Sequence, residues 1–463
     1  MKKTLLIAGL GIMVFASCQK ENVNAPRTEQ ITRTISVVEP ETRSSYTDGS
    51  GISLTYTEYM TVNYWTGETD APVEGTNTLT AVTGGATPDA ETKTWSFTHD
   101  AVEGETYYNY QFILPYNSTN VFNSKKTGAQ IRLSPIQYPG GNTFDPSQDY
   151  LVGQTQLKKD LNTVDPVLFK RLFVPFKLAL KGNDIKNKTY TAVTFEINQP
   201  ATAENCLSSV GYVNTNPNYN YKTFSTEAKY KSNSVTAMFT QIKFNGHNNT
   251  LTTKGGTYNC WFMVKPSSFP AGTTATVSLY TTEGKYSKTV TLTDGVEFKN
   301  DFLNRMTISL SNDNFTAGEL FTVTSYAKKT NHTSQDRLDI SKADFTADVT
   351  NSALASTTRI HQSEPDDDKT EVKYTNLEGD KPVQTVRIYT SQFISLSVDG
   401  EIAIYKEDGT TELGRASYKG EDLYTTGGYV EISLSEPVSS FIIKGVGKNA
   451  WLHISAIHTI PAE

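Results

Sequence analysis

Short segments in which polar and apolar residues alternate run through most of this chain, with turn residues between them. Side chains of a β-strand point to opposite faces in turn, so an alternation of period two indicates a strand with one buried face. Asp-Gly pairs at 48–49, 294–295, 399–400 and 408–409 mark tight turns, because glycine tolerates positive φ and aspartate bonds back to the backbone. The pattern predicts an all-β chain of tandem β-sandwiches. Clear examples of the alternation are Ile52–Tyr56, Thr276–Tyr280, Val386–Ile388 and Val430–Leu434.

The composition agrees with strands and disfavours one class of partner. Tyr (25) and Phe (21) are abundant, and aromatic residues fit the half-buried surface of a sheet. The 463 residues are too many for one core and suit two to four domains. Lys and Arg number 42 against 49 Asp and Glu, a net charge of −7, and no basic stripe appears, so nucleic acid is not an expected partner. One or two short helices are expected at most, the better candidate near Ser341–Phe345.

The first eighteen residues have the pattern of an export signal. Lys2 and Lys3 form a basic start, Thr4–Ser17 carries no charge, and the small residues before Cys18 suit a cleavage site. The run ending in Cys18 resembles the lipobox of bacterial lipoproteins, which implies a lipid on Cys18 that holds the chain on a membrane. Gln19–Asn22 resembles a tag that directs lipoproteins to the outer surface of the outer membrane. The alternative is an ordinary signal peptide with a chance cysteine nearby.

Breaks in the strand pattern suggest where domains begin and end. A turn-rich stretch ends near Asp165-Pro166, and the polar run Ser311–Asn314 follows the strand-like Met306–Leu310. The expected order is a lipoprotein signal (1–18), a tether (19–30), an N-terminal sandwich (31–165), a second sandwich (166–313) and a C-terminal domain (318–463).

Three stretches carry a resemblance to a known family. Residues 41–58 read ETRSSYTDGSGISLTYTE, residues 169–180 FKRLFVPFKLAL and residues 298–310 FKNDFLNRMTISL. The first resembles the start of the fimbrillins, which are type V pilins and Mfa-like surface lipoproteins, and the others resemble the opening and closing strands of the second fimbrillin subdomain. Tyr56 departs from the family's Trp, and Tyr59-Met60 from its Gly-Asp pair. The resemblance implies two transthyretin-like sandwiches over about residues 30–313.

The same resemblance implies assembly by strand exchange. An unpaired sheet edge presents open N–H and C=O groups that another strand can satisfy. In fimbrillins a propeptide strand fills such a groove until a protease cuts after an Arg, and a strand of another pilus subunit then replaces it. Here the candidate strand is Ile31–Val38, with Arg43, Arg33 and Arg27 as candidate cleavage sites. The alternative is that this strand stays in the first sandwich and Arg43 is an ordinary surface charge.

Residues 318–463 have no counterpart in a stalk pilin, whose C-terminal segment is the donor strand. Segments from Val383 onward resemble a jelly-roll, galactose-binding-like module. Such modules bind glycans by stacking an aromatic ring on a sugar face. The candidate contacts are Trp451, Tyr418, Tyr424 and Tyr429, and the alternative is that Trp451 lies in the core while the tyrosines pack along strands.

Other residue types give little support for catalysis. The histidines are scattered, Asp366–Asp368 reads as a solvated loop, and no metal or cofactor is expected. Cys206 and Cys260 can form a disulfide or remain buried free thiols. The resulting hypothesis is a non-enzymatic surface lipoprotein that acts in adhesion as a fimbrial tip or accessory subunit. The alternative is an outer-membrane glycan-binding lipoprotein of a polysaccharide-uptake system. An enzyme is the third hypothesis.

Overall fold

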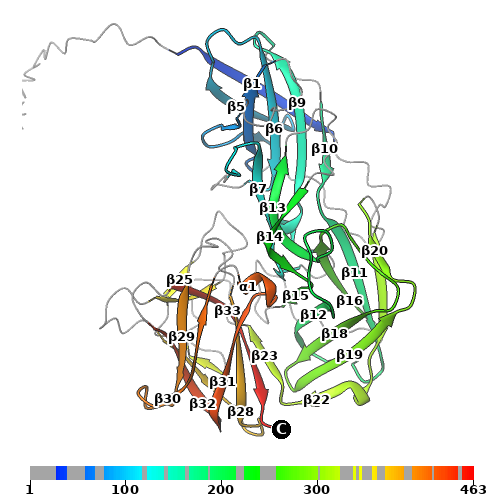
Figure 1. The fold of residues 1–463 in the computed structure, drawn as a ribbon, viewed down its shortest axis with the longest axis vertical. Coiled ribbons are helices and arrows are strands. Elements are labelled where there is room, and N and C mark those ends of the chain that lie inside the picture. Colours follow the sequence, from blue (N-terminus) through cyan, green and yellow to red (C-terminus); the bar gives the residue numbers. More distant parts are fainter. Residues whose placement is uncertain are drawn as a thin grey trace, which may run out of the picture.

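The chain folds as tandem β-sandwiches, which confirms the fold class expected from the alternation. Figure 1 shows two sandwiches end to end along the long axis and a C-terminal domain beside the second one. Helical structure in the described residues is confined to α1 (Asp422–Thr425) and two 3₁₀ turns, Pro146–Gln148 and Asn312–Asn314. None of the helices there has the length and apolar character needed to cross a membrane. The computed structural model describes residues 28–38, 58–67, 78–116, 122–139, 144–161, 166–185, 188–214, 224–239, 257–300, 303–323, 337–339, 344–346, 357–361, 371–390, 399–419, 422–446 and 451–463.

The first sandwich is one eight-stranded sheet that folds over itself. Strands β5 and β6 are not neighbours in this sheet, yet the rings of Phe97 and Phe112 lie 5.9 Å apart across the core. In β5 the alternation holds as expected, since Trp95 and Phe97 are buried while Ser96 between them is exposed. The spatial order is β3 (Thr80–Ala81), β2 (Thr61–Thr66), β6 (Tyr107–Leu114), β9 (Leu151–Lys158), β10 (Val167–Arg171), β1 (Gln30–Val38), β5 (Thr94–Asp100) and β4 (Thr87–Asp89).

The second sandwich packs a six-stranded sheet against a three-stranded one. The rings of Phe176 and Phe195, one from each sheet, lie 4.9 Å apart in its core. The larger sheet runs β22 (Phe315–Ala317), β19 (Gly284–Leu292), β18 (Thr273–Thr281), β12 (Tyr190–Ile197), β15 (Ser234–Met238) and β8 (Ile136–Gln137). The smaller one runs β16 (Thr257–Val264), β11 (Val174–Lys181) and β21 (Asn304–Ser309). Beside them lie the sheet β14 (Phe224–Ser232), β13 (Ser208–Asn214) and β7 (Gly128–Leu133), and the pair β17 (Ser267–Phe269) and β20 (Val296–Phe298).

Strand pairing crosses the boundary expected at 165/166. Strand β10 comes after it but pairs with β9 and β1 of the first sheet. Strands β7 and β8 come before it but pair with β13 and β15. These pairings join residues far apart in sequence, so local turn signals do not reveal them. The two sandwiches are therefore connected through shared sheets as well as through the chain between them.

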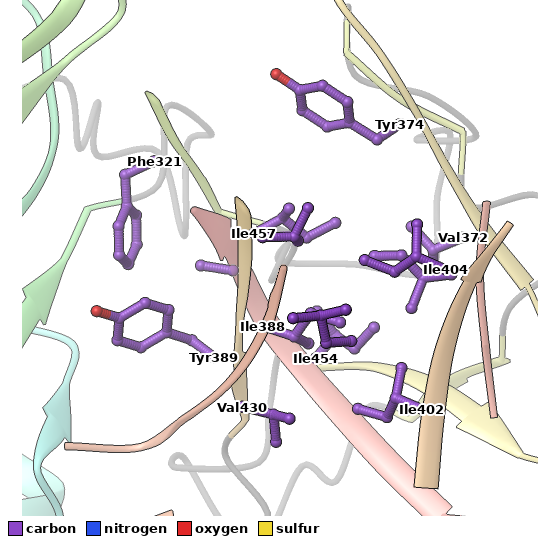
Figure 2. Close-up of a cluster of buried hydrophobic side chains, with 14 of the residues drawn as sticks. Phe321, Val372, Tyr374, Ile388, Tyr389, Ile402, Ile404, Val430, Ile454 and Ile457 are labelled. Atoms are coloured by element: carbon purple, nitrogen blue, oxygen red, sulfur yellow. The ribbon is translucent and has the colours of Figure 1, made fainter. Parts of the chain in front are cut away.

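The C-terminal domain is a sandwich of two sheets. Figure 2 shows its core, with Ile388 and Ile454 of one sheet facing Ile402 and Ile404 of the other. One sheet runs β25 (Asp344–Thr346), β26 (Thr357–His361), β33 (Trp451–Pro461), β28 (Val383–Thr390) and β31 (Tyr429–Val438), and β23 (Leu320–Val323) also pairs with β33. The other runs β24 (Leu338–Asp339), β27 (Glu371–Thr375), β32 (Ser440–Val446), β29 (Gly400–Tyr405) and β30 (Glu412–Tyr418).

A helix was expected near Ser341–Phe345, but the described part of that segment forms a strand. Residues 341–343 lie outside the described residues, and Asp344–Thr346 is a strand that pairs with β26. Local helix propensity is weak over so few residues, and pairing with a neighbouring strand overrides it.

The core of the C-terminal domain continues onto the outer face of the second sandwich. The ring of Phe321 lies 4.8 Å from Tyr389 in its own domain and 5.1 Å from Tyr280 in β18. Figure 2 shows Phe321 and Tyr389 on the side of the cluster that faces the second sandwich. Gly427, with φ of +76°, allows the turn after α1 to approach β15, because a Cβ there would lie 3.0 Å from Ser234. The two domains are thus packed against each other.

Candidate functional site

Strand β1, the expected exchange strand, lies inside the first sheet. It pairs antiparallel with β5 from Gln30–Asp100 to Ser36–Thr94, and parallel with β10 only at Val37 and Val38. Ile31 and Ile35 are 4% and 0% exposed and belong to the core of the first sandwich. Removal of β1 would therefore expose a groove with one long open edge along β5.

Arg33, one of the three candidate cleavage sites, is fully buried in the middle of β1. Its Nη2 donates hydrogen bonds to the backbone carbonyls of Lys158 and Lys159 at 2.8 and 3.1 Å, and its Nε donates to the hydroxyl of Tyr110 at 3.3 Å. Burial raises the pKa of Tyr110 to about 12, so the phenol stays neutral and accepts this bond. A protease can reach the Arg33 peptide bond only after β1 has left the sheet.

The other N-terminal candidates fall outside the described residues. This holds for the lipidation site Cys18 and for Arg27 and Arg43. Because Arg27 precedes β1 and Arg43 follows it, cleavage at the two sites would have different effects on β1. A cut after Arg27 leaves β1 attached to the rest of the chain, whereas a cut after Arg43 separates the whole of β1 from it.

The last strand of the chain, β33, is hydrogen-bonded on both sides. One side pairs with β28 from Val383–Pro461 to Thr390–Ile454. The other side pairs with β23 between residues 456 and 459 and with β26 between residues 451 and 454. The C-terminal strand is thus a central strand of its own domain.

The four aromatic candidates of the C-terminal domain lie in different places. Tyr418, at the end of β30, is 5% exposed and packs in the core, so its ring offers no face to a sugar. Trp451 opens β33 opposite His361, and Tyr424 lies in α1, but the side chains of both fall outside the described residues. Tyr429 opens β31, is partly buried, and lines a cavity.

This cavity, of about 520 Å³, lies between the second sandwich and the C-terminal domain. We call it the interdomain cavity. Its floor is the outer face of the six-stranded sheet, and its opposite wall comes from β28, β31 and the turn after α1. The lining residues are Thr194, Glu196, Ile197, Gln199, Pro200, Ala201, Lys231, Ser232, Asn233, Ser234, Thr276, Ser278, Tyr280, Lys285, Ser287, Arg387, Tyr389, Thr426 and Tyr429.

The floor carries hydroxyl groups because strand alternation places them there. Val193 and Phe195 point into the core of the second sandwich, so Thr194 and Glu196 point outward. Thr194 lies opposite Ser278 in the neighbouring strand, and Ser278 shares a hydrogen bond of 3.0 Å with Ser287. The result is a row of hydroxyls running across three strands.

The opposite wall combines aromatic rings with a guanidinium group. Tyr389 and Tyr429 are paired in register, with ring centroids 5.1 Å apart. The guanidinium carbon of Arg387 lies 4.8 Å from the centre of the Tyr429 ring, and its Nε donates to Glu431 at 2.6 Å. Glu196 on the floor is exposed to the cavity, but the surrounding protein partly desolvates its carboxylate and raises its pKa, and the charge of Arg387 opposes that rise.

Beside the cavity, a buried ionic cluster joins the two domains. Glu319 Oε1 accepts hydrogen bonds from Lys285 Nζ at 2.6 Å and from His458 Nε2 at 2.9 Å. Burial alone would raise the pKa of Glu319, but the His458 and Lys285 bonds outweigh it and lower that pKa to about 2. Burial lowers the pKa of the fully buried His458, so a neutral imidazole donates to the charged carboxylate.

Sequence reasoning named Tyr429 but missed the residues around it. Glu196, Asn233 and Arg387 come from separate strands or their ends, and no spacing in the sequence links them. The two remaining cysteines, Cys206 and Cys260, are buried and free, which is one of the two alternatives considered. Within the described ranges, no three His, Cys, Asp or Glu side chains gather closely enough to hold a metal ion.

No protein-family model and no curated protein matches the chain. Among solved structures, it is similar to a candidate cell adhesion protein from Bacteroides ovatus (10% identity, TM-score 0.38, 62% of this chain and 95% of that one). It is also similar to a fimbrial assembly protein from Parabacteroides distasonis (8% identity, TM-score 0.26, 63% and 98%). A third similarity is to the CBM32 of AlyQ in complex with 4,5-unsaturated mannuronic acid (17% identity, TM-score 0.18, 23% and 78%). Similarity at this level does not assign a function to the chain.

Proposed function

We propose that the chain is a cell-surface adhesin that acts as a fimbrial tip or accessory subunit, delivered to the outer membrane by a lipid on Cys18. The observation that carries this proposal is an asymmetry between the two ends of the chain. The first sandwich holds an N-terminal strand, β1, whose removal would open a groove for a partner strand. The C-terminal strand, β33, is paired along both edges in its own domain. A subunit of this kind can accept a strand, whereas its strand β33 is already fully paired and is not available for donation.

Acceptance without donation is what the end of a filament requires. A shaft subunit must do both, because each copy joins the one before it to the one after it. Breaking the pairs of β33 with β28, β26 and β23 would dismantle a sheet whose side chains fill the core of the C-terminal domain. That cost disfavours β33 as a donor strand and supports a terminal position.

The groove would open only after one particular cleavage. A cut after Arg43 separates β1 from the rest of the chain, whereas a cut after Arg27 does not, and Arg33 is buried. We therefore infer that processing, where it occurs, follows Arg43. It would also discard Cys18, so the lipid serves delivery rather than permanent anchoring of the assembled subunit.

The interdomain cavity favours a second candidate function, an anchored glycan-binding lipoprotein of a polysaccharide-uptake system. Such a protein has no need of strand exchange and would keep both Cys18 and β1. The mature N-terminus separates the two candidates. Mass spectrometry of the surface-exposed chain from the native bacterium should find a species that begins after Arg43. A population that consists only of chains beginning at lipidated Cys18 would overturn the fimbrial role and favour the anchored one.

A further inference from the structure

The interdomain cavity has the chemistry of a binding site for a hydroxyl-rich molecule. Its volume of about 520 Å³ lies within the range of about 300–1,000 Å³ typical of small-molecule sites. Hydroxyl groups of β12, β18 and β19 form the floor, while Pro200 and the ring of Tyr429 add apolar surface. A ligand that matches both must carry many hydroxyls and also an apolar face. Saccharides combine these two properties.

A buried acceptor without a partner points to the same conclusion. Asn233 lines the cavity and is 7% exposed. Its Nδ2 donates to the carbonyl of Gln199 at 2.8 Å, but its Oδ1 has no hydrogen-bond partner among the described residues. A buried carbonyl oxygen left in this state is unfavourable, so native proteins rarely keep one. A hydroxyl group of a ligand in the cavity would satisfy it.

The charges around the cavity favour a neutral ligand. Three cations line the cavity. Arg387 is paired with Glu431, Lys285 with Glu319, and Lys231 also has an interaction partner. None of the three is therefore free to serve as the main counter-charge of a phosphate or carboxylate. Glu196, which is exposed on the floor, adds an acceptor suited to hydroxyl donors and would repel an anion.

We propose that the interdomain cavity binds a neutral saccharide, held by Tyr429 from the C-terminal domain and by Asn233 and Glu196 from the second sandwich. This inference rests on the proposed surface role, whether in adhesion or in glycan capture, and supplies its ligand. Because residues of both domains form the site, neither domain alone would hold the ligand fully. The packing of the C-terminal domain against the second sandwich is thus part of the site.

The test uses the chain without its signal segment and Cys18, residues 19–463, and a panel of named probes. Saturation-transfer NMR and calorimetry would measure binding of methyl β-galactopyranoside, methyl α-mannopyranoside, N-acetylglucosamine, lactose and cellobiose, with glucuronate and inorganic phosphate as anionic probes. We expect at least one neutral sugar to bind. Tyr429→Ala and Asn233→Ala should each weaken that binding about tenfold, the loss expected for one buried hydrogen bond or ring contact.

Matched variants keep the test decisive. Glu196→Gln changes an exposed side chain and should weaken binding without affecting folding, while Glu297→Gln, also exposed and remote, should not. Tyr429→Phe keeps the ring and should retain binding, and it is the variant to compare with wild type if Tyr429→Ala does not fold. Tyr59→Ala is the control for loss of an exposed tyrosine.

Three results would overturn the inference. They are the absence of binding by every neutral sugar at millimolar concentration, binding of the anionic probes alone, and sugar binding that survives the Tyr429, Asn233 and Glu196 substitutions. Sugar binding that is lost instead in Trp451→Ala would place the site elsewhere in the C-terminal domain. Glycan binding in vitro and processing on the cell are separate measurements, so the failure of this inference and of the fimbrial role can be told apart.

Discussion

Replacing Glu319 by alanine should weaken the attachment of the C-terminal domain to the second sandwich. The carboxylate is 6% exposed and accepts hydrogen bonds from Lys285 of β19 and His458 of β33. It therefore connects one strand of each domain. Glu319→Ala leaves a buried imidazole N–H without its acceptor and a largely buried ammonium group without its counter-charge.

The structure sets the size of the effect. Removing one partner of a buried ion pair costs about 3–5 kcal/mol, and the Lys285 side chain, 20% exposed, recovers some hydration. We therefore expect the free energy of unfolding to fall by about 3 kcal/mol.

The pH dependence has a definite sign. The pKa of Glu319 is lower in the folded chain than in the unfolded one, so its stabilising contribution is fully present above pH 4.5. That contribution disappears as the pH falls from 4.5 towards about 2, because the unfolded chain then binds the proton first. The difference between wild type and Glu319→Ala should shrink over that interval.

Urea titrations of the full chain at pH 7 and at pH 3 would measure both effects. The control is Glu283→Ala, because Glu283 also pairs with a lysine, Lys188, at 2.6 Å, but its side chain is 62% exposed. Exposed pairs contribute about 0–1 kcal/mol. The reasoning fails if Glu319→Ala is no more destabilising than Glu283→Ala at pH 7, or if its effect is unchanged at pH 3.

Three further predictions concern buried groups. Trypsin should not cut the native chain after Arg33, which is fully buried, and a native fragment ending there would show that β1 leaves its sheet spontaneously. Cys206 and Cys260 are buried, and burial raises the pKa of both thiols. Iodoacetamide should therefore modify neither thiol in the native chain, and both after unfolding without reductant. Failure of these two cysteines to react in the unfolded chain would reveal a disulfide. Trp95→Ala should cost about 3–5 kcal/mol by leaving a cavity, against about 0.5 kcal/mol or less for Tyr59→Ala at an exposed position, as chemical denaturation would report.

Features that depend on local alternation could be read from the sequence. The inward face of β1 is an example, since Ile31 and Ile35 are both buried. Arg33 lies on the same face and was read only as a candidate cleavage site. Its burial depends on the carbonyls of Lys158 and Lys159, which come from the end of a strand far along the chain. No local sequence pattern predicts such a contact.

The interdomain cavity lay beyond sequence reasoning for a similar reason. Tyr429 was named because aromatic residues suit sugars, but so was Tyr418, which lies in the core. Asn233 lies between β14 and β15, and Arg387 lies in β28. Neither has a local sequence signal of a binding site, because the site forms only where the two domains pack together. The short helix α1 was also missed, because a four-residue helix depends on tertiary contacts rather than on propensity.

The location of the chain in filaments tests the central proposal most directly. Immunogold labelling of pili from the native bacterium, with antibodies against the C-terminal domain, would report it. An open acceptor groove together with a C-terminal strand paired on both edges predicts label at one end of each filament. Label repeated along the shaft, or confined to the cell envelope with none on filaments, would contradict a terminal subunit.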